Sequence, residues 1–193
     1  MNSFKEGYLK KNSVVIFPTD TVYGMGCLIN DDKATQKIYQ IKGRDQTKEL
    51  VVLCSSLEEV KQLAVLSKKA EKIAETFWPG ALTIILNSSE KYYKMTGKKT
   101  VGVRIPNNDT ALNLIKINGP LKTTSVNKSN HPPLNDIVKI KEQFSELVDY
   151  IYEEENKNYL NISSTTISLI DNEIEFLRIG SISKERIMEV NND

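Results

Sequence analysis

Hydroxyl groups and a carboxylate gather near the N-terminus of the chain, directly after a short apolar run. Three hydroxyls and one carboxylate lie within five residues: Thr19, Asp20, Thr21 and Tyr23. Pro18 ends the apolar run, because it has no N–H to donate to a sheet. Polar turns at strand ends are where open α/β sheets bind ligands, and these groups suit hydrogen bonding to a polar ligand. A hairpin-like turn with satisfied hydroxyls explains the same residues, so both interpretations stay open.

Cations, further hydroxyls and one amide lie at or near other predicted strands, and three of the cations lie between the first predicted helix and the second predicted strand. They are Lys42, Arg44, Lys48, Arg104, Ser125, Asn127, Ser129, Ser163, Ser164, Thr165 and Arg178. The chain has 26 cationic residues, and only four of them are Arg, so an Arg here indicates a need for a planar, bidentate donor. Together the groups suit a polyanion, phosphates above all. The chain has no Walker-type motif and no G-x-G-x-x-G, so a nucleotide site would have another design.

Each of these residues also has a purely structural explanation. Lys42 and Lys48 flank a helix end, where Lys is favourable to the helix dipole. Arg104 and Arg178 could form ion pairs at a rim. The Lys- and Tyr-containing stretch 91–99 could bind RNA by charge and stacking, although we expect a solvated loop there. The joint pattern, rather than any single residue, favours a binding site.

Composition narrows the classes of protein. A length of 193 residues suits one domain, 1–193, and a net charge of +1 argues against a general nucleic-acid coat. Cys27 and Cys54 form no C-x-x-C pair and are expected to be buried. His131 is the only histidine, so no His-based metal site is proposed. Without a signal pattern or an apolar run of about 20 residues, we expect a soluble, cytoplasmic protein with no membrane contact.

The elements that position these groups follow from hydrophobic periodicity and capping residues. Helices are expected at 4–11, 31–42, 56–66, 67–77, 110–117, 136–144 and 183–190. Strands are expected at 14–17, 50–54, 81–86, 100–106, 121–126, 147–152, 162–170 and 173–179, with an acidic loop at 153–158. Strands alternate with helices, but some neighbouring strands lack a crossover. This predicts an α/β fold with a mixed, twisted β-sheet and packed helices.

The motifs, taken in chain order, resemble those of one family. Pro18 to Gly26 reads P-T-D-T-V-Y-G-M-G and resembles the P-T-E-T-V-Y-G-L-G elbow of the YrdC/TsaC family of L-threonylcarbamoyladenylate synthases. Lys42 to Leu50 is similar to that family's K-x-R-P-x-x-N/K-P-L. The stretches 78–83, 101–106 and 125–129 are similar to W-P-G-P-x-T, V-A-V-R-x-P and S-A-N-x-S. Ser164-Thr165 with 177–180 resembles S-T-V-V-D followed by L-R-x-G, so the resemblance covers almost the whole chain.

This resemblance implies a YrdC-like fold with a concave basic cavity. It also implies that L-threonine, bicarbonate and ATP are joined into threonylcarbamoyl-AMP with release of pyrophosphate. The product would serve threonylcarbamoyl-transferase proteins that modify tRNA. Because the resemblance ends with the catalytic domain, we expect the short, single-domain form of the enzyme.

The resemblance also implies roles for particular residues. L-Threonine would be held by Thr21, Arg104, Ser125 and Ser164. ATP would be held by Arg44, Lys48, Thr100, Asn127, Asn135 and Arg178. Lys42 and Arg44 are the implied catalytic residues, and Mg²⁺ would be carried by the phosphates of ATP. No general base is required, and Asp20, the nearest candidate, is expected to support the elbow.

Some positions depart from the family pattern. They are Asp20 for Glu, Glu49 for Pro, Leu53 where His is frequent, Val126 for Ala, Asn130 for Gly, Asn135 for Thr, and 166–168 for V-V-D. Glu49 places an anion near the expected phosphates, and the contact of Asn135 with the nucleotide is in question because the family has Thr there.

Two other functions remain as alternatives. One is an RNA-binding module of the same fold without synthase activity, or with weak RNA contact; the lack of a broad basic surface argues against it. The other is a carbamoyl-transfer domain like that of hydrogenase maturation proteins, whose zinc-finger and acylphosphatase-like segments are not seen in this sequence.

Overall fold

The computed structural model describes residues 3–154 and 162–192. The strands are β1 (Val15–Phe17), β2 (Gly24–Leu28), β3 (Val51–Leu53), β4 (Leu82–Asn87), β5 (Thr100–Arg104), β6 (Leu121–Ser125), β7 (Tyr150–Ile151), β8 (Thr165–Ser168) and β9 (Glu175–Arg178). The helices are α1 (Asp32–Lys42), α2 (Leu57–Leu63), α3 (Lys68–Phe77), α4 (Glu90–Thr96), α5 (Asp109–Asn118), α6 (Ile137–Phe144) and α7 (Lys184–Asn192). Within these described ranges, no helix has the length and apolar character needed to cross a membrane.

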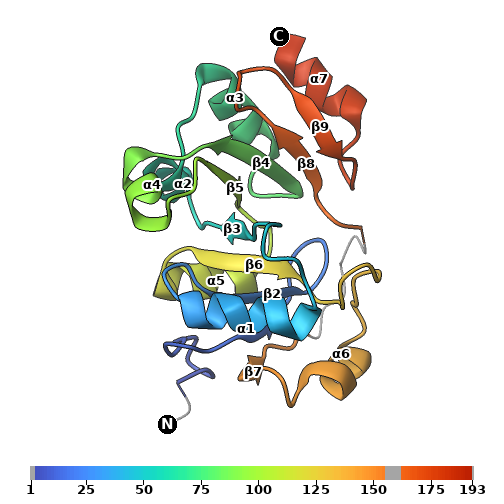
Figure 1. The fold of residues 1–193 in the computed structure, drawn as a ribbon. Helices are drawn as coiled ribbons and strands as arrows, with labels where there is room; N and C mark the ends of the chain where they lie inside the picture. The colour runs from blue at the N-terminus through green and yellow to red at the C-terminus, as the bar shows by residue number, and fades with distance from the viewer. Residues whose placement is uncertain (1–2, 155–161, 193) are drawn as a thin grey trace.

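All the strands belong to one sheet, in the order β7-β1-β2-β6-β3-β5-β4-β8-β9. The pairs β1–β7, β3–β5 and β4–β8 are parallel, and the other neighbours are antiparallel. Figure 1 shows that the sheet twists along the length of the molecule, with the N-terminus at one end and the C-terminus at the other. The predicted mixed, twisted α/β sheet is therefore confirmed.

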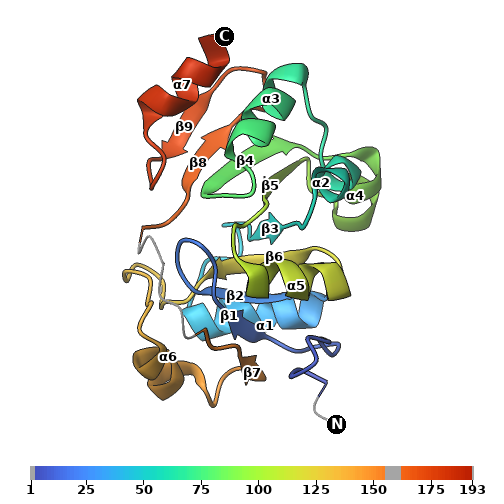
Figure 2. The same ribbon diagram turned by 180° about the vertical axis from the view of Figure 1, so that it is seen from behind.

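The two faces of the sheet are covered by different helices. In the half that holds β1, β2 and β6, α1 lies on one face and α5 on the other, as the two opposite views show (Figures 1 and 2). Ile38 of α1 packs with Ile16 and Met25, whereas Leu114 of α5 packs with Phe17. In the other half, α2, α3 and α4 contribute buried side chains to a third apolar cluster. Cys27 and Cys54 are free and buried in these clusters, as predicted.

Local capping explains why several helices begin and end where the sequence predicts. The Asp31 side chain accepts a hydrogen bond from the backbone N–H of Ala34 at 3.0 Å, and Gly43 ends α1 in the left-handed conformation at φ 60°. Ser67 Oγ accepts from the N–H of Ala70 at 3.2 Å and begins α3. Each of these signals lies within a few residues of the helix end that it fixes.

Two of the predicted elements are wrong. Residues 4–11 form no helix; the chain makes a turn instead, in which Gly7, at φ 84°, donates its N–H to the Phe4 carbonyl. The predicted solvated loop at 91–99 is largely helix α4. Ser89 caps that helix, Gly97 ends it at φ 70°, and the buried ring of Tyr92 packs into the core. Most of the predicted acidic loop 153–158 lies outside the described residues.

The polar stretch after β1 leads into a strand that was not predicted. Residues 18–23 connect β1 to β2 as a hairpin loop, with Val15 opposite Gly26 and Phe17 opposite Gly24. A Cβ at Gly26 would lie 2.9 Å from the Lys122 carbonyl oxygen and 3.0 Å from the Phe17 ring. Glycine is therefore needed for β2 to pack in the middle of the sheet.

Candidate functional site

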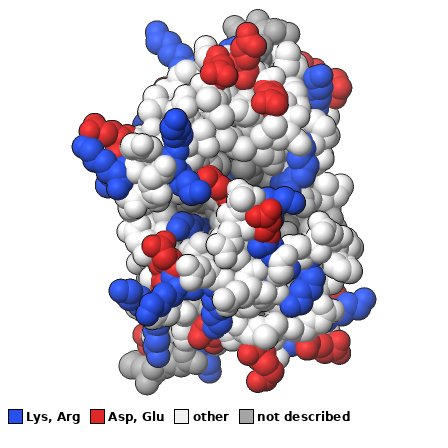
Figure 3. Space-filling view, in the orientation of Figure 1, with Lys and Arg blue, Asp and Glu red and all other residues white. Residues whose placement is uncertain are grey.

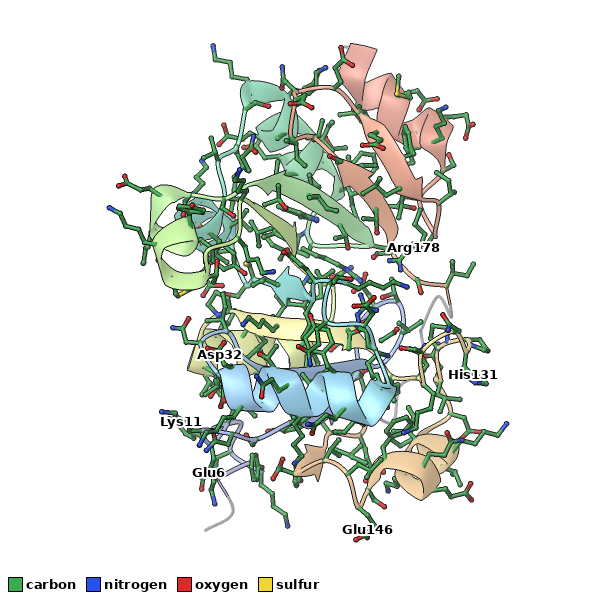
Figure 4. The ribbon with its side chains drawn as sticks, in the orientation of Figure 1. Glu6, Lys11, Asp32, His131, Glu146 and Arg178 are labelled. Carbon is green, nitrogen blue, oxygen red and sulfur yellow. The ribbon has the colours of Figure 1, made fainter. Side chains whose placement is uncertain are left out.

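A cavity of about 150 Å³ lies where the 18–23 loop meets β3, β5, β6 and the residues before β8. Its lining consists of Thr19, Thr21, Val22, Tyr23, Gly24, Arg44, Glu49, Val51, Leu53, Thr83, Arg104, Thr123, Thr124, Ser125, Ser163, Ser164 and Arg178. Figure 4 shows Arg178 at the level where the half with β4 and β8 meets the half with β2 and β6. The hairpin loop is thus a turn and a cavity wall at once, so the two interpretations of that stretch are compatible.

Arg104, at the end of β5, is held on several sides. Its Nε donates to the Gly80 carbonyl at 2.9 Å, its Nη1 to Thr21 Oγ1 at 2.9 Å, and its Nη2 to Asp20 Oδ1 at 2.5 Å. Asp20 also accepts from the backbone N–H of Asn107 at 3.1 Å. Burial lowers the pKa of Arg104, and the Asp20 carboxylate opposes that shift. Asp20 therefore supports the guanidinium, and no base role follows from its position.

A hydroxyl network lines the cavity on both sides of Arg104. Thr19 Oγ1 lies 3.1 Å from Thr21 Oγ1 and donates to the Val22 carbonyl at 2.6 Å. Across the cavity, Ser164 Oγ lies 2.9 Å from Thr83 Oγ1. The network presents several hydroxyls to whatever occupies the cavity.

Arg178 is held by Ser164, in the part of the cavity wall that precedes β8. Its Nε donates to the Ser164 carbonyl at 3.0 Å and its Nη2 to Ser164 Oγ at 3.1 Å. Burial lowers the pKa of Arg178, and the nearby charge of Arg44 lowers it further. Two cations that repel each other across one cavity are stabilised by an anion between them.

The side chain of Arg44 is held by backbone carbonyls of the loop that follows α1. Arg44 Nε donates to the Lys48 carbonyl at 3.1 Å, and Nη2 donates to the Glu49 carbonyl at 3.2 Å. Tyr39 also donates its hydroxyl to the Lys48 carbonyl at 3.1 Å. The side chain of Lys48 is exposed and lies outside the cavity lining, so here it is the backbone of Lys48 that positions Arg44.

Lys42 lies behind the cavity and is only 2% exposed. Its Nζ donates to the carbonyls of Ser125 and Asn127 and, at 2.8 Å, to Asn127 Oδ1. Ser125 Oγ donates to the same Oδ1 at 2.6 Å. Burial lowers the pKa of Lys42 to about 8, with a smaller contribution from Arg44. Lys42 and Asn127 therefore fix the turn after β6, and neither lines the cavity.

Two other predicted residues also lie outside the lining. Asn135 Oδ1 accepts the backbone N–H of Tyr23 at 3.0 Å and so joins the hairpin loop to the segment before α6. Thr100 begins β5, four residues before Arg104, and is roughly 13 Å from it along the strand. The two-residue period places both on the same face of the sheet, with Gly102 between them.

Some cavity residues were not among the predicted site residues. Thr83, Thr123 and Thr124 contribute to the lining, as does Glu49. Thr83 lies within the W-P-G-A-L-T stretch, so a signal for it was present in the sequence. Thr123 and Thr124 lie within β6, where a threonine gives no signal beyond strand propensity.

Positive charge gathers in the cavity, whereas the surface in Figure 3 carries both signs of charge. Three Arg and one Glu line the cavity. Over the face shown in Figure 3, Lys and Arg are interspersed with Asp and Glu. In the described part of the chain, no three His, Cys, Asp or Glu side chains gather as a set of metal ligands.

Several known proteins are similar to this chain over most of its length. The Sua5/YciO/YrdC family model, described as "Telomere recombination", matches residues 7–180. Threonylcarbamoyl-AMP synthases of Pyrococcus abyssi and Bacillus subtilis are 32% and 33% identical over 188 and 187 residues, which is 95% and 94% of this chain. The matches cover 55% and 54% of those proteins, so the chain spans about half the length of these curated relatives. The crystal structure of P. abyssi Sua5 complexed with L-threonine aligns with a TM-score of 0.87 and 33% identity, covering 97% of this chain and 56% of that one. The chain belongs to the Sua5/YciO/YrdC family.

Proposed function

We propose that this protein makes threonylcarbamoyl-AMP from L-threonine, bicarbonate and ATP and releases pyrophosphate. The names of the two relatives and the L-threonine in the Sua5 structure support this proposal. The observation that carries it is the cavity itself, in which an oriented, buried guanidinium (Arg104) lies near two further Arg side chains. One cavity can therefore hold a carboxylate and a polyphosphate together.

Threonine is proposed to bind at Arg104. The three hydrogen bonds described above use three of the five N–H groups of the guanidinium. They leave one N–H on each terminal nitrogen, and these two groups would donate to the oxygens of a carboxylate. Thr21, Ser125 and Ser164 would then meet the amine and hydroxyl of threonine from the walls.

ATP is proposed to bind along the Arg44 and Arg178 side of the cavity. Lys48 would reach the phosphates from the exposed loop, and Thr100 would lie under the nucleoside end of the same sheet face. Asn127 and Asn135 would contribute indirectly, because their hydrogen bonds fix the turn after β6 and the hairpin loop 18–23. Lys42 would add positive charge behind the phosphates while it fixes the turn after β6. Mg²⁺ would enter with the phosphates of ATP.

The chemistry follows from bringing two anions together. Bicarbonate takes up a proton and loses water to give CO₂; the neutral amine of threonine attacks the CO₂ carbon and releases a proton, which gives a carbamate. A carbamate oxygen attacks the α-phosphorus of ATP, and pyrophosphate leaves. Cations on the cavity wall neutralise both reactants, and holding the reactants in one cavity lowers the entropic cost. The product would be used in the cytoplasm by threonylcarbamoyl-transferase proteins that modify tRNA.

The direct test supplies the protein with MgATP, L-threonine and bicarbonate, and measures pyrophosphate together with the adenylate by mass spectrometry. We expect pyrophosphate to depend on both threonine and bicarbonate. Equal pyrophosphate without threonine, or none at all, would refute the synthase reaction. Binding of RNA without any adenylate would favour the alternative of an RNA-binding module.

A variant pair tests the carboxylate site. Arg104→Ala is expected to lower kcat/KM for threonine about 100-fold, because a charged bidentate contact contributes about 3 kcal/mol. Lys139→Ala, at an exposed position of α6, should leave the constant within twofold. Circular dichroism checks that both variants fold. Equal activity of the two folded variants contradicts the role given to Arg104.

A further inference from the structure

Glu49 lies in the wall between two cavities. It lines the site described above and also a second cavity, of about 400 Å³, between α1 and α4. The second cavity is lined in part by Tyr39, Tyr92 and Lys98. At this position the family pattern has a proline, which carries no charge. A carboxylate at the edge of a nucleotide site is therefore a feature of this chain that needs a physical explanation.

The backbone of Glu49 contacts one cation of the site, Arg44. Its carbonyl accepts the Arg44 Nη2 hydrogen bond at 3.2 Å, so its side chain starts within a few ångströms of the guanidinium. The carboxylate nevertheless pairs with a different cation. Glu49 Oε1 lies 3.2 Å from Lys98 Nζ, and the two side chains are 40% and 52% exposed.

Lys98 comes from a segment with a fixed backbone. Gly97 ends α4 in the left-handed conformation at φ 70°, and the N–H of Lys98 donates to Thr96 Oγ1 at 3.2 Å. Two residues later the chain enters β5 at Thr100. Lys98 lines only the second cavity, so its ammonium holds the Glu49 carboxylate from that side.

An unpaired carboxylate at this point would oppose the binding of a triphosphate. Arg44 would then be shared between the ligand and the Glu49 anion. We propose that Lys98 is a positioning residue of the nucleotide site, which holds and neutralises Glu49 so that Arg44 faces an anionic ligand without a competing carboxylate. The inference rests on the nucleotide site of the proposed function.

The test is a double-mutant cycle of Lys98 and Glu49. The Kd for MgATP is measured for each variant by isothermal titration calorimetry without threonine. Lys98→Met frees the Glu49 carboxylate and should weaken MgATP binding roughly fivefold, the size expected for one exposed ion pair. Adding Glu49→Gln to Lys98→Met removes that anion and should bring the Kd back to within twofold of the wild type. A purely structural ion pair predicts the opposite, because the double variant would then bind no better than Lys98→Met.

Lys94→Met is the matched control. It removes the same charge from α4 itself, four residues before Lys98, but Lys94 pairs with Glu90 at an exposed position outside both cavities. We expect its Kd to stay within twofold of the wild type. The loss in Lys98→Met should shrink between 0.05 and 0.5 M salt, because screening weakens the repulsion from Glu49.

Either of two outcomes overturns the inference: Lys98→Met binds MgATP like Lys94→Met, or the double variant fails to recover. The proposed function is judged separately. If the protein makes the adenylate but the Kd for MgATP does not change among the variants, only the role of Lys98 is refuted. If the double variant recovers MgATP binding but the protein makes no adenylate, only the synthase reaction is refuted.

Discussion

Replacing Asp20 by Ala would leave the buried guanidinium of Arg104 without its carboxylate partner. The two side chains are 12% and 7% exposed, and the Nη2–Oδ1 distance is 2.5 Å. Removing one partner of a buried ion pair costs about 3–5 kcal/mol. The backbone N–H of Asn107 also loses its acceptor. We expect Asp20→Ala to lower the free energy of unfolding by about 4 kcal/mol, and Asp20→Asn, which keeps an acceptor oxygen, by about 2 kcal/mol.

Urea unfolding followed by the fluorescence of Trp78 measures this loss. Trp78 is the single tryptophan and is buried, and its indole N–H donates to the Leu82 carbonyl at 2.7 Å. It lies two residues before Gly80, whose carbonyl also accepts from Arg104. The probe therefore reports on the region where the ion pair lies.

Asp32→Ala serves as the matched control. Asp32 lies at the start of α1 (Figure 4), and its side chain is 94% exposed and 3.7 Å from Lys122. Its removal should change the free energy of unfolding by about 0.5 kcal/mol or less. A cost below about 1 kcal/mol for Asp20→Ala would refute the reasoning, because the pair would then behave like an exposed one.

Two further predictions concern the turn after β6 and the end of β9. The pKa of Lys42, about 8, is below its value of about 10.5 in an unfolded chain, so the wild type should gain about 3 kcal/mol of stability from this group as pH rises from 8 to 10.5. Urea unfolding across that range should show that Lys42→Met lacks this gain; parallel pH profiles would contradict it. In Gly180→Ala, the new Cβ would overlap the Ser163 carbonyl oxygen, whereas in Gly102→Ala it meets ordinary contacts at 3.7–3.9 Å. The first change should cost more than about 2 kcal/mol and the second less than about 1 kcal/mol in the same assay, and equal costs would disprove the clash.

The parts of the fold that could be predicted from the sequence are those fixed by local signals. Asp31, Gly43 and Ser67 act on backbone groups within a few residues, so their effect can be read without the tertiary structure. Strand β2 could not be predicted in this way, because its residues Gly24 and Gly26 are of a type that is typical of turns. They form a strand because β1 and β6 approach closely on either side.

Helix α4 was missed for a related reason. Ser89 and Gly97 are local capping signals, but the run of Lys and Tyr between them has no clear apolar face, and the position of the helix depends on burial of the Tyr92 ring against residues far along the chain. The same limit applies to the site. The motif residues Arg104 and Ser164 could be singled out by type, but whether Lys42 faces the cavity or the turn behind it depends on tertiary contacts.

The partner of Arg104 is the clearest case of information that only the fold supplies. Asp20 lies 84 residues before Arg104, on a loop between two other strands. The aspartate is one methylene shorter than the family's glutamate, yet it reaches both the guanidinium and the N–H of Asn107. Together with Gly80 and Thr21 it fixes the plane of the guanidinium before any ligand enters. If a carboxylate binds to that pre-oriented fork, Asp20→Ala must weaken threonine binding as well as the fold, because the same hydrogen bonds serve both.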